Sequence, residues 1–102
     1  MSVLNITEDN FDELVLNSGK TCVVDMFATW CGPCKMMSPI IDEIAEENGD
    51  IVVGKVDVDE SGELAMQFNV MSIPTILIFK NGELAETFIG LQSKETILNA
   101  IQ

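Results

Sequence analysis

The sequence TCVVDMFATWCGPC occupies residues 21–34. Residues 21–28 are mainly apolar or β-branched, which is typical of a strand buried on both faces. Cys31 and Cys34 follow, and Pro33 between them suits the first turn of a helix, where its missing N–H costs no hydrogen bond. The stretch therefore predicts a buried strand, a short connection, and a helix that begins at two cysteines.

Outward from this stretch, short elements of alternating type fill the rest of the chain. Apolar residues at helical spacing extend the helix after Pro33 as far as Asn48. Further strands are predicted over residues 3–6, 51–58, 75–79 and 83–89, and further helices over 7–17, 61–68 and 93–101. Asn81-Gly82 is a strong hairpin signal, so the last two strands should pair antiparallel. The alternation predicts an α/β fold with a mixed sheet and helices on both of its faces.

The composition is that of a globular chain with a single domain, spanning residues 1–102. The chain has 17 acidic residues and 5 lysines, and its net charge of −12 disfavours nucleic acid as a partner and favours a monomer. No apolar run approaches the ~20 residues of a membrane helix, so no membrane partner is expected. No basic or long apolar leader opens the chain, so we expect a cytoplasmic protein.

The two close cysteines are the candidate catalytic pair. Because the chain has no histidine, a Cys-His nucleophile and zinc sites that need imidazole are excluded. A zinc site completed by Cys22 and a carboxylate, an iron–sulfur cluster shared by two chains, and an inactive pair remain as alternatives. Redox chemistry needs no metal or cofactor. The first helical turn can bring the two sulfur atoms together, and the helix N-terminus stabilises a thiolate at Cys31.

The stretch FATWCGPCKMMSP, residues 27–39, closely resembles the active-site segment of the thioredoxin family. The resemblance covers essentially the whole chain, and its further motifs are Val24-Asp25, Lys55 to Asp59, Ile73-Pro74-Thr75, Phe79 to Gly82, and Gly90. It implies a thioredoxin fold, in which a central mixed five-stranded sheet of order 1-3-2-4-5 is flanked by four helices. It also implies a protein-disulfide reductase that acts on disulfide-containing proteins and is recharged by a thioredoxin reductase.

Asp25 is a carboxylic acid within an otherwise apolar strand. Its side chain could lie at the strand edge and face water. A buried carboxyl, by contrast, has a raised pKa and can exchange protons with a thiol near neutral pH. The resemblance assigns Asp25 this second role, as the base for Cys34. Lys55 is the lone cation of the strand predicted over 51–58, and it either tunes Asp25 or extends along the strand to reach water.

The resemblance also implies a substrate-binding surface around the cysteines. Thioredoxins carry a cis proline opposite the dithiol, which here would be Pro74, and the backbone of Ile73 could then pair with an extended substrate. Trp30 is the single tryptophan, and it either packs in the core or flanks this surface. The remaining members of the surface, by resemblance, are Gly32, Pro33, Gly90 and Leu91.

Cys22 lies within the strand and outside the pair. A buried cysteine usually behaves as a small hydrophobic residue, and a regulatory thiol is the alternative. Two other functions compete with reduction: a domain that holds a partner without turnover, and an oxidase or isomerase of the same fold. An intact WCGPC together with Asp25 argues against the first, and Gly32-Pro33 between the cysteines favours a reductase over the second.

Overall fold

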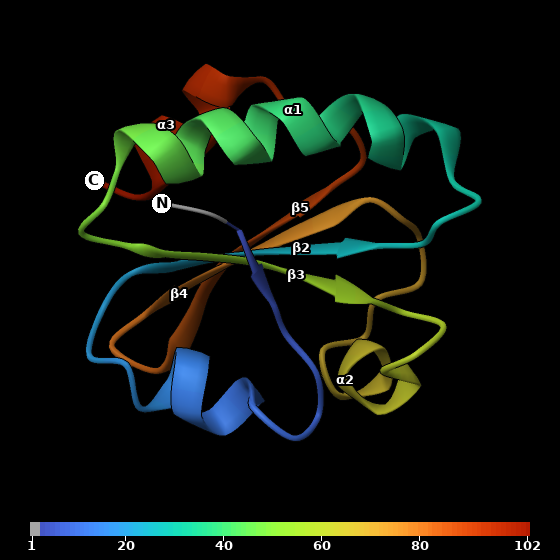
Figure 1. Ribbon diagram of the computed structural model, residues 1–102, viewed down its shortest axis with the longest axis horizontal. Helices are drawn as coiled ribbons and strands as arrows, with labels where there is room; N and C mark the ends of the chain where they lie inside the picture. The colour runs from blue at the N-terminus through green and yellow to red at the C-terminus, as the bar shows by residue number, and fades with distance from the viewer. Residues whose placement is uncertain (1–2) are drawn as a thin grey trace.

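A central sheet lies between two layers of helices (Figure 1). The computed structural model describes residues 3–102. Its strands are β1 (Leu4–Asn5), β2 (Cys22–Phe27), β3 (Val52–Asp57), β4 (Thr75–Lys80) and β5 (Glu83–Ile89). Its helices are η1 (Asp12–Leu16), α1 (Gly32–Glu47), α2 (Gly62–Gln67) and α3 (Lys94–Ala100). None of these helices within residues 3–102 is both long and apolar enough to span a bilayer.

The sheet has the strand order β1-β3-β2-β4-β5, which confirms the order implied by the thioredoxin resemblance. The central strand β2 is parallel to β3 and antiparallel to β4. The register places Asp25 between Lys55 of β3 and Ile76 of β4. β5 pairs antiparallel with β4 and with no other described strand, so its outer edge is open. The sheet is therefore mixed, as predicted.

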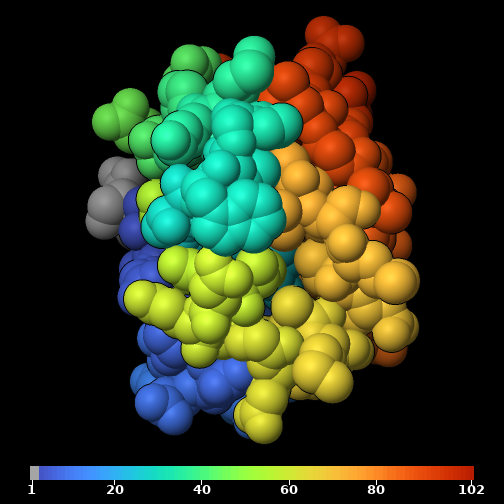
Figure 2. All heavy atoms as spheres, turned by 90° about the vertical axis from the view of Figure 1, so that its right-hand side faces the viewer, coloured from blue at the N-terminus to red at the C-terminus, as the bar shows by residue number. Residues whose placement is uncertain are grey.

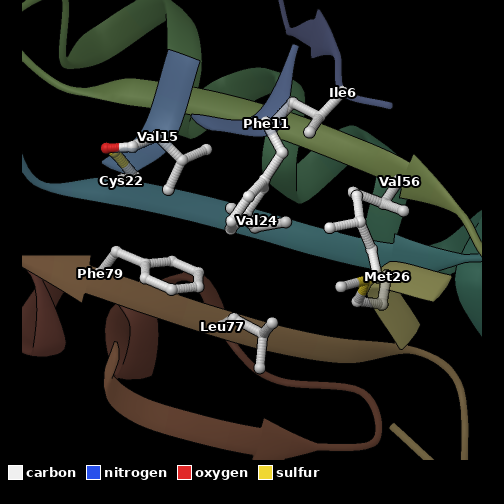
Figure 3. Close-up of a cluster of buried hydrophobic side chains, with 10 residues drawn as sticks. Ile6, Phe11, Val15, Cys22, Val24, Met26, Val56, Leu77 and Phe79 are labelled. Carbon is white, nitrogen blue, oxygen red and sulfur yellow. The ribbon is translucent and has the colours of Figure 1, made fainter. Parts of the chain in front are cut away.

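Each face of the sheet is covered by its own apolar core. In Figure 1, α1 and α3 cover one face, and η1 and α2 cover the other. Side chains of β2 alternate between the two cores: Val23 packs with Met37 of α1, whereas Cys22 and Val24 pack with apolar side chains of η1 and β4 (Figure 3). Because both faces of β2 are covered, an apolar side chain is expected at each of its positions, and Asp25 is the exception.

The first predicted helix differs most from its expectation. The sequence predicts a helix capped by Thr7, but residues 8–10 form a turn and the helix η1 begins only at Asp12. Thr7 nevertheless makes the bonds of a cap: its hydroxyl accepts the Asp9 N–H, and its carbonyl accepts the Phe11 N–H. η1 is a π-helix, in which the Asn17 N–H donates to the Asp12 carbonyl. The predicted helix is therefore present, but its regular part is shorter than predicted and has π rather than α geometry.

The hairpin between β4 and β5 has the predicted turn. Asn81 and Gly82 both have a positive φ, at 53° and 80°. A Cβ on Gly82 would lie 2.7 Å from the Leu16 carbonyl oxygen, so glycine is needed for the close approach as well as for the turn. The hairpin tip therefore packs against the end of η1, far along the chain from β4.

Candidate active site

The start of α1 positions the two cysteines. Cys31 is the N-cap and has an extended backbone, with φ −90° and ψ 117°. Gly32 and Pro33 form the first helical turn, and the Cys34 N–H donates a hydrogen bond to Cys31 Sγ at 3.2 Å. The two cysteines form a disulfide, and their Cα atoms are 5.3 Å apart, within the ordinary range for such bonds. The predicted pair is therefore within bonding distance at a helix N-terminus.

The loop before β4 faces this disulfide. The Ile73–Pro74 peptide bond is cis, as the resemblance implied. The Ile73 carbonyl oxygen lies 3.8 Å from Cys31 Sγ, and the Gly90 N–H donates to the Pro74 carbonyl at 2.8 Å. In Figure 2 the start of α1, coloured cyan, lies against the yellow and orange segments that come much later in the chain. The fold thus brings the cysteines, the cis proline and Gly90 to one end of the sheet.

Exposed apolar side chains surround the nearly buried disulfide. Cys31 and Cys34 keep only 6% and 4% of their surface exposed. Trp30 is 69% exposed, and its Nε1–H donates to Asp59 Oδ2 at 2.8 Å. Leu91, beyond β5, is also exposed. Of the two roles considered for Trp30, the core-packing one is therefore wrong, and its indole lies on the surface beside the cysteines.

Asp25 is buried beneath the disulfide, on the face of β2 that α1 covers. Its side chain is 2% exposed, and no hydrogen-bond partner within residues 3–102 reaches its Oδ1. Burial raises the pKa of Asp25 to about 7, and the charge of Lys55 opposes this shift to a smaller extent. The edge position facing water is therefore wrong for this carboxyl, which can gain and lose a proton near neutral pH.

A pocket of about 210 Å³ connects Asp25 to Cys34. Asp25, Cys34 and Lys55 all contribute to its lining. Lys55 is half-buried, its Nζ lies 5.4 Å from the centre of the Phe27 ring, and no ion pair joins it to Asp25 within the described residues. The lysine thus lies over the Phe27 ring, and its positive charge opposes the rise in the pKa of Asp25.

Two neighbours of the site carried no role in the sequence analysis. Asp59 lies within a motif that carried the resemblance, yet its bond to the Trp30 indole depends on β2 and β3 ending side by side. Met71 lines a second pocket next to Ile73. Its position two residues before Ile73 was the only available signal. Among residues 3–102, no three cysteine or acidic side chains are grouped so that they could hold a metal ion.

A disulfide at the start of a helix, opposite a cis proline and above a buried carboxyl, defines a class of proteins, the thiol–disulfide oxidoreductases. Comparison with known families then identifies the group. The Thioredoxin family profile matches residues 2–102, and the chain belongs to the thioredoxin family. It is a thiol–disulfide oxidoreductase that reduces disulfides by thiol–disulfide exchange.

Relatives of known name agree with this assignment over nearly the full chain. Thioredoxin of Rickettsia felis is 47% identical over 98 residues, which cover 95% of this chain and 93% of that protein. Thioredoxin of Staphylococcus haemolyticus is 42% identical over 102 residues, covering 99% and 96%. The chloroplastic M-type thioredoxin of Spinacia oleracea is 45% identical over 101 residues, covering 98% of this chain and 56% of that protein. Members of the family act on disulfides and receive electrons from a reductase.

Proposed function

We propose that Cys31 is the attacking thiol and Cys34 the resolving one in the reduction of protein disulfides. The observation that carries this assignment is the hydrogen bond from the Cys34 N–H to Cys31 Sγ at the N-terminus of α1. An N–H donor and the positive end of a helix both stabilise a thiolate, and the thiolate is the nucleophile. Cys34 lies within the helix and lines the inner pocket with Asp25.

The exchange proceeds in two balanced steps. The Cys31 thiolate attacks one sulfur of the substrate disulfide, so a mixed disulfide forms and the other substrate sulfur leaves as a thiolate that takes up a proton. Cys34 then loses its proton and attacks Cys31 Sγ, which releases the second substrate thiolate. Two electrons pass to the substrate, and the Cys31–Cys34 disulfide remains.

Asp25 is the proposed base for the second step. Its pKa of about 7 allows it to be a carboxylate when Cys34 must lose a proton and a carboxylic acid afterwards. The pocket that it shares with Cys34 has room for a water molecule to relay the proton. Lys55 is the proposed tuning residue, because its charge favours the ionised form of Asp25.

The substrate is proposed to dock on the exposed surface around the disulfide. Ile73 lies directly before the cis Pro74, and its backbone can add an extended substrate segment as a further strand. The Ile73 carbonyl already lies 3.8 Å from Cys31 Sγ, so a segment paired there would bring its own cysteine to the attacking atom. The other proposed members of the docking surface are Trp30, Gly32, Pro33, Gly90 and Leu91.

The wider setting is proposed on similar grounds. We expect residues 1–102 to act as one domain and as a monomer, with a thioredoxin reductase as the electron donor and the cytoplasm as the compartment. A pair that works as a reductant must be returned to the dithiol, and a reducing compartment with a reductase does this. Electron transport to protein disulfides is then its role, and no bound metal or cofactor takes part.

The reduction potential of the Cys31–Cys34 pair is the measurement that tests this function against its rivals. A reductase should hold a potential well below that of an oxidase, so glutathione at defined ratios should leave much of the pair oxidised. The same preparation should reduce insulin repeatedly when a reductant is supplied. A strongly oxidising potential would assign the chain to the oxidases. Failure to turn over insulin would favour the other rival function, a domain that holds a partner without turnover.

A further inference from the structure

The methionines within residues 3–102 fall into two groups. Met26 and Met37 are fully buried in the two cores. Met36, Met66 and Met71 are exposed, at 62%, 78% and 94% of their surface. A thioether that is exposed to solvent is open to oxidation, whereas a buried one is shielded. Within the described part of the chain three methionines can therefore react with an oxidant, and their positions decide what such a reaction would do.

Only one of the three exposed methionines lines a pocket beside the disulfide. This pocket has a volume of about 170 Å³, and its lining is apolar except for one serine: Trp30, Val58, Val70, Met71, Ser72 and Ile73. It is much smaller than the ~300–1,000 Å³ of small-molecule sites, so it suits a single side chain. Because Ile73 also contacts Cys31, a side chain within about two residues of an attacked cysteine could enter it.

We propose that Met71 is an oxidation-sensitive specificity residue, whose conversion to the sulfoxide weakens the docking of protein disulfides without changing the chemistry of the dithiol. The inference rests on the proposed function and names the substrate feature that the pocket recognises, an apolar side chain close to the disulfide. The unoxidised thioether is flexible and polarisable, so it adapts to apolar side chains of different shape. The sulfoxide is polar, and an apolar substrate side chain gives it no hydrogen-bond partner.

The oxidant is a hydroperoxide, and the step is a transfer of one oxygen atom. The O–O bond of the peroxide breaks, an S–O bond forms at Met71, the sulfur is oxidised, and the peroxide is reduced to water or an alcohol. No electrons come from the cysteines. In the oxidised protein Cys31 and Cys34 are joined in the disulfide, and Cys22 is fully buried. Peroxide therefore meets exposed methionines and no exposed thiol within residues 3–102.

The test treats the disulfide form of the full chain with hydrogen peroxide and then assays the reduced protein on two substrates. Insulin is a protein disulfide that can fill the pocket, and hydroxyethyl disulfide is too small to need it. Peptide mapping should find sulfoxide at Met36, Met66 and Met71. We expect kcat/KM on insulin to fall roughly five- to tenfold through KM, the loss typical of an unpaired polar group, while the rate on hydroxyethyl disulfide is retained.

Matched variants identify the responsible methionine. Each protein is compared with its own untreated sample. After peroxide, kcat/KM on insulin should fall as much in Met66→Leu and Met36→Leu as in the parent, whereas it should not fall in Met71→Leu. Independently of peroxide, Met71→Gln should raise KM on insulin, and Met66→Gln should not. The inference would be overturned if peroxide lowered the activity of Met71→Leu as much as that of the parent, or lowered activity equally on both substrates. It would also be overturned if no sulfoxide formed at Met71. None of these results would affect the proposed function. An untreated protein that fails on insulin would overturn the proposed function first.

Discussion

Two regions of the molecule hold sulfur atoms in opposite settings. Cys22 lies within the core between β2 and η1, and Cys31 lies at the N-terminus of α1 (Figure 3 shows the first region). Both residues are nearly buried, at 0% and 6% exposure. The groups around them differ: Cys22 Sγ faces two backbone carbonyls, those of Lys20 and Val15 at 3.5 and 3.8 Å. Cys31 Sγ faces one, that of Ile73 at 3.8 Å, and also accepts the Cys34 N–H at 3.2 Å.

This difference indicates that the groups around a sulfur act together with burial to separate the inert thiol of Cys22 from the proposed nucleophile, Cys31. Burial is the largest cause of the raised pKa of Cys22, and the Ser18 hydrogen bond and the charge of Lys20 oppose it to a smaller extent. Carbonyl oxygens are hydrogen-bond acceptors, so they also favour the protonated thiol of Cys22. An N–H at a helix N-terminus is a donor, so it favours the thiolate of Cys31. Five measurements test this comparison.

The largest expected effect on activity comes from replacing the resolving thiol, Cys34. Cys34→Ser should lower insulin turnover by roughly 10³-fold or more, because the mixed disulfide at Cys31 then has no internal thiol to resolve it. Adducts with protein disulfides should accumulate and should disappear when reductant is added. Mass spectrometry of the adducts checks this, with Cys22→Ala as the matched control. Normal turnover by Cys34→Ser would show that Cys34 is not the resolving thiol, and Cys22 would then have to be tested in that role.

A smaller loss of activity is expected when the buried carboxyl of Asp25 is replaced. Asp25→Asn keeps the size of the side chain but cannot accept a proton, so insulin reduction should slow by up to about 10²-fold, the usual contribution of one general base. The loss should appear in the second step, as slower decay of the mixed disulfide in single-turnover experiments. A rate equal to that of the parent would remove Asp25 from the mechanism.

The same variant tests the raised pKa through the pH dependence of stability. Asp25 has a pKa of 3.8 in its ordinary state and about 7 in the folded protein. Between these values the folded protein retains a proton that the unfolded chain has lost, so the free energy of unfolding should fall as pH rises, by about 1.4 kcal/mol per pH unit. Denaturant unfolding from pH 4 to pH 8 should show this fall for the parent relative to Asp25→Asn. A constant difference between the two proteins would contradict the assigned pKa.

The reactivity of the reduced protein towards alkylation should be about tenfold or more higher at Cys31 than at Cys22, because only the thiolate attacks. Brief exposure to iodoacetamide at neutral pH, followed by peptide mapping, gives the two rates in one sample. Cys34, which lies within the helix, should also react after Cys31. Faster labelling of Cys34 would reverse the proposed roles of the two thiols.

The smallest effect is expected in the core region. Cys22→Ala removes a buried sulfur and should lower the free energy of unfolding by about 1 kcal/mol through the cavity left behind. Insulin turnover should not change, because Cys22 lies on the opposite face of β2 from Asp25. Paired stability and activity assays check both expectations. A change in turnover would show that Cys22 participates in the chemistry.

Much of the fold could be predicted from local pattern. The strand that ends before Trp30, the helix that begins at the cysteines and the strand Glu83–Ile89 all have strong local signals in side-chain type and turn residues. The strand order could not be obtained in this way, because no local pattern states which strands become neighbours. It followed from the resemblance. A helix was also predicted at η1, but its π geometry and its start at Asp12 have no signal in the spacing of apolar residues.

The active site likewise has features that local sequence predicts and features that depend on the tertiary structure. The two cysteines are only three positions apart in the chain, so the sequence alone predicted their spacing and their place at the start of a helix. The bond from Trp30 to Asp59 and the pocket beside Met71 join segments that are distant in sequence, and only the tertiary structure brings them together. The raised pKa of Asp25 was predictable in direction, since a carboxyl in an apolar strand must lose water on folding.

The open outer edge of β5 bears on how the protein behaves when concentrated. An unpaired strand edge can template the addition of another chain, and Leu84 and Ile89 offer exposed apolar side chains on this one. Glu83 and Glu86 stand on the same strand and are exposed. Two such edges repel each other, and this repulsion keeps the open edge from pairing with a second copy of the chain when the protein is concentrated.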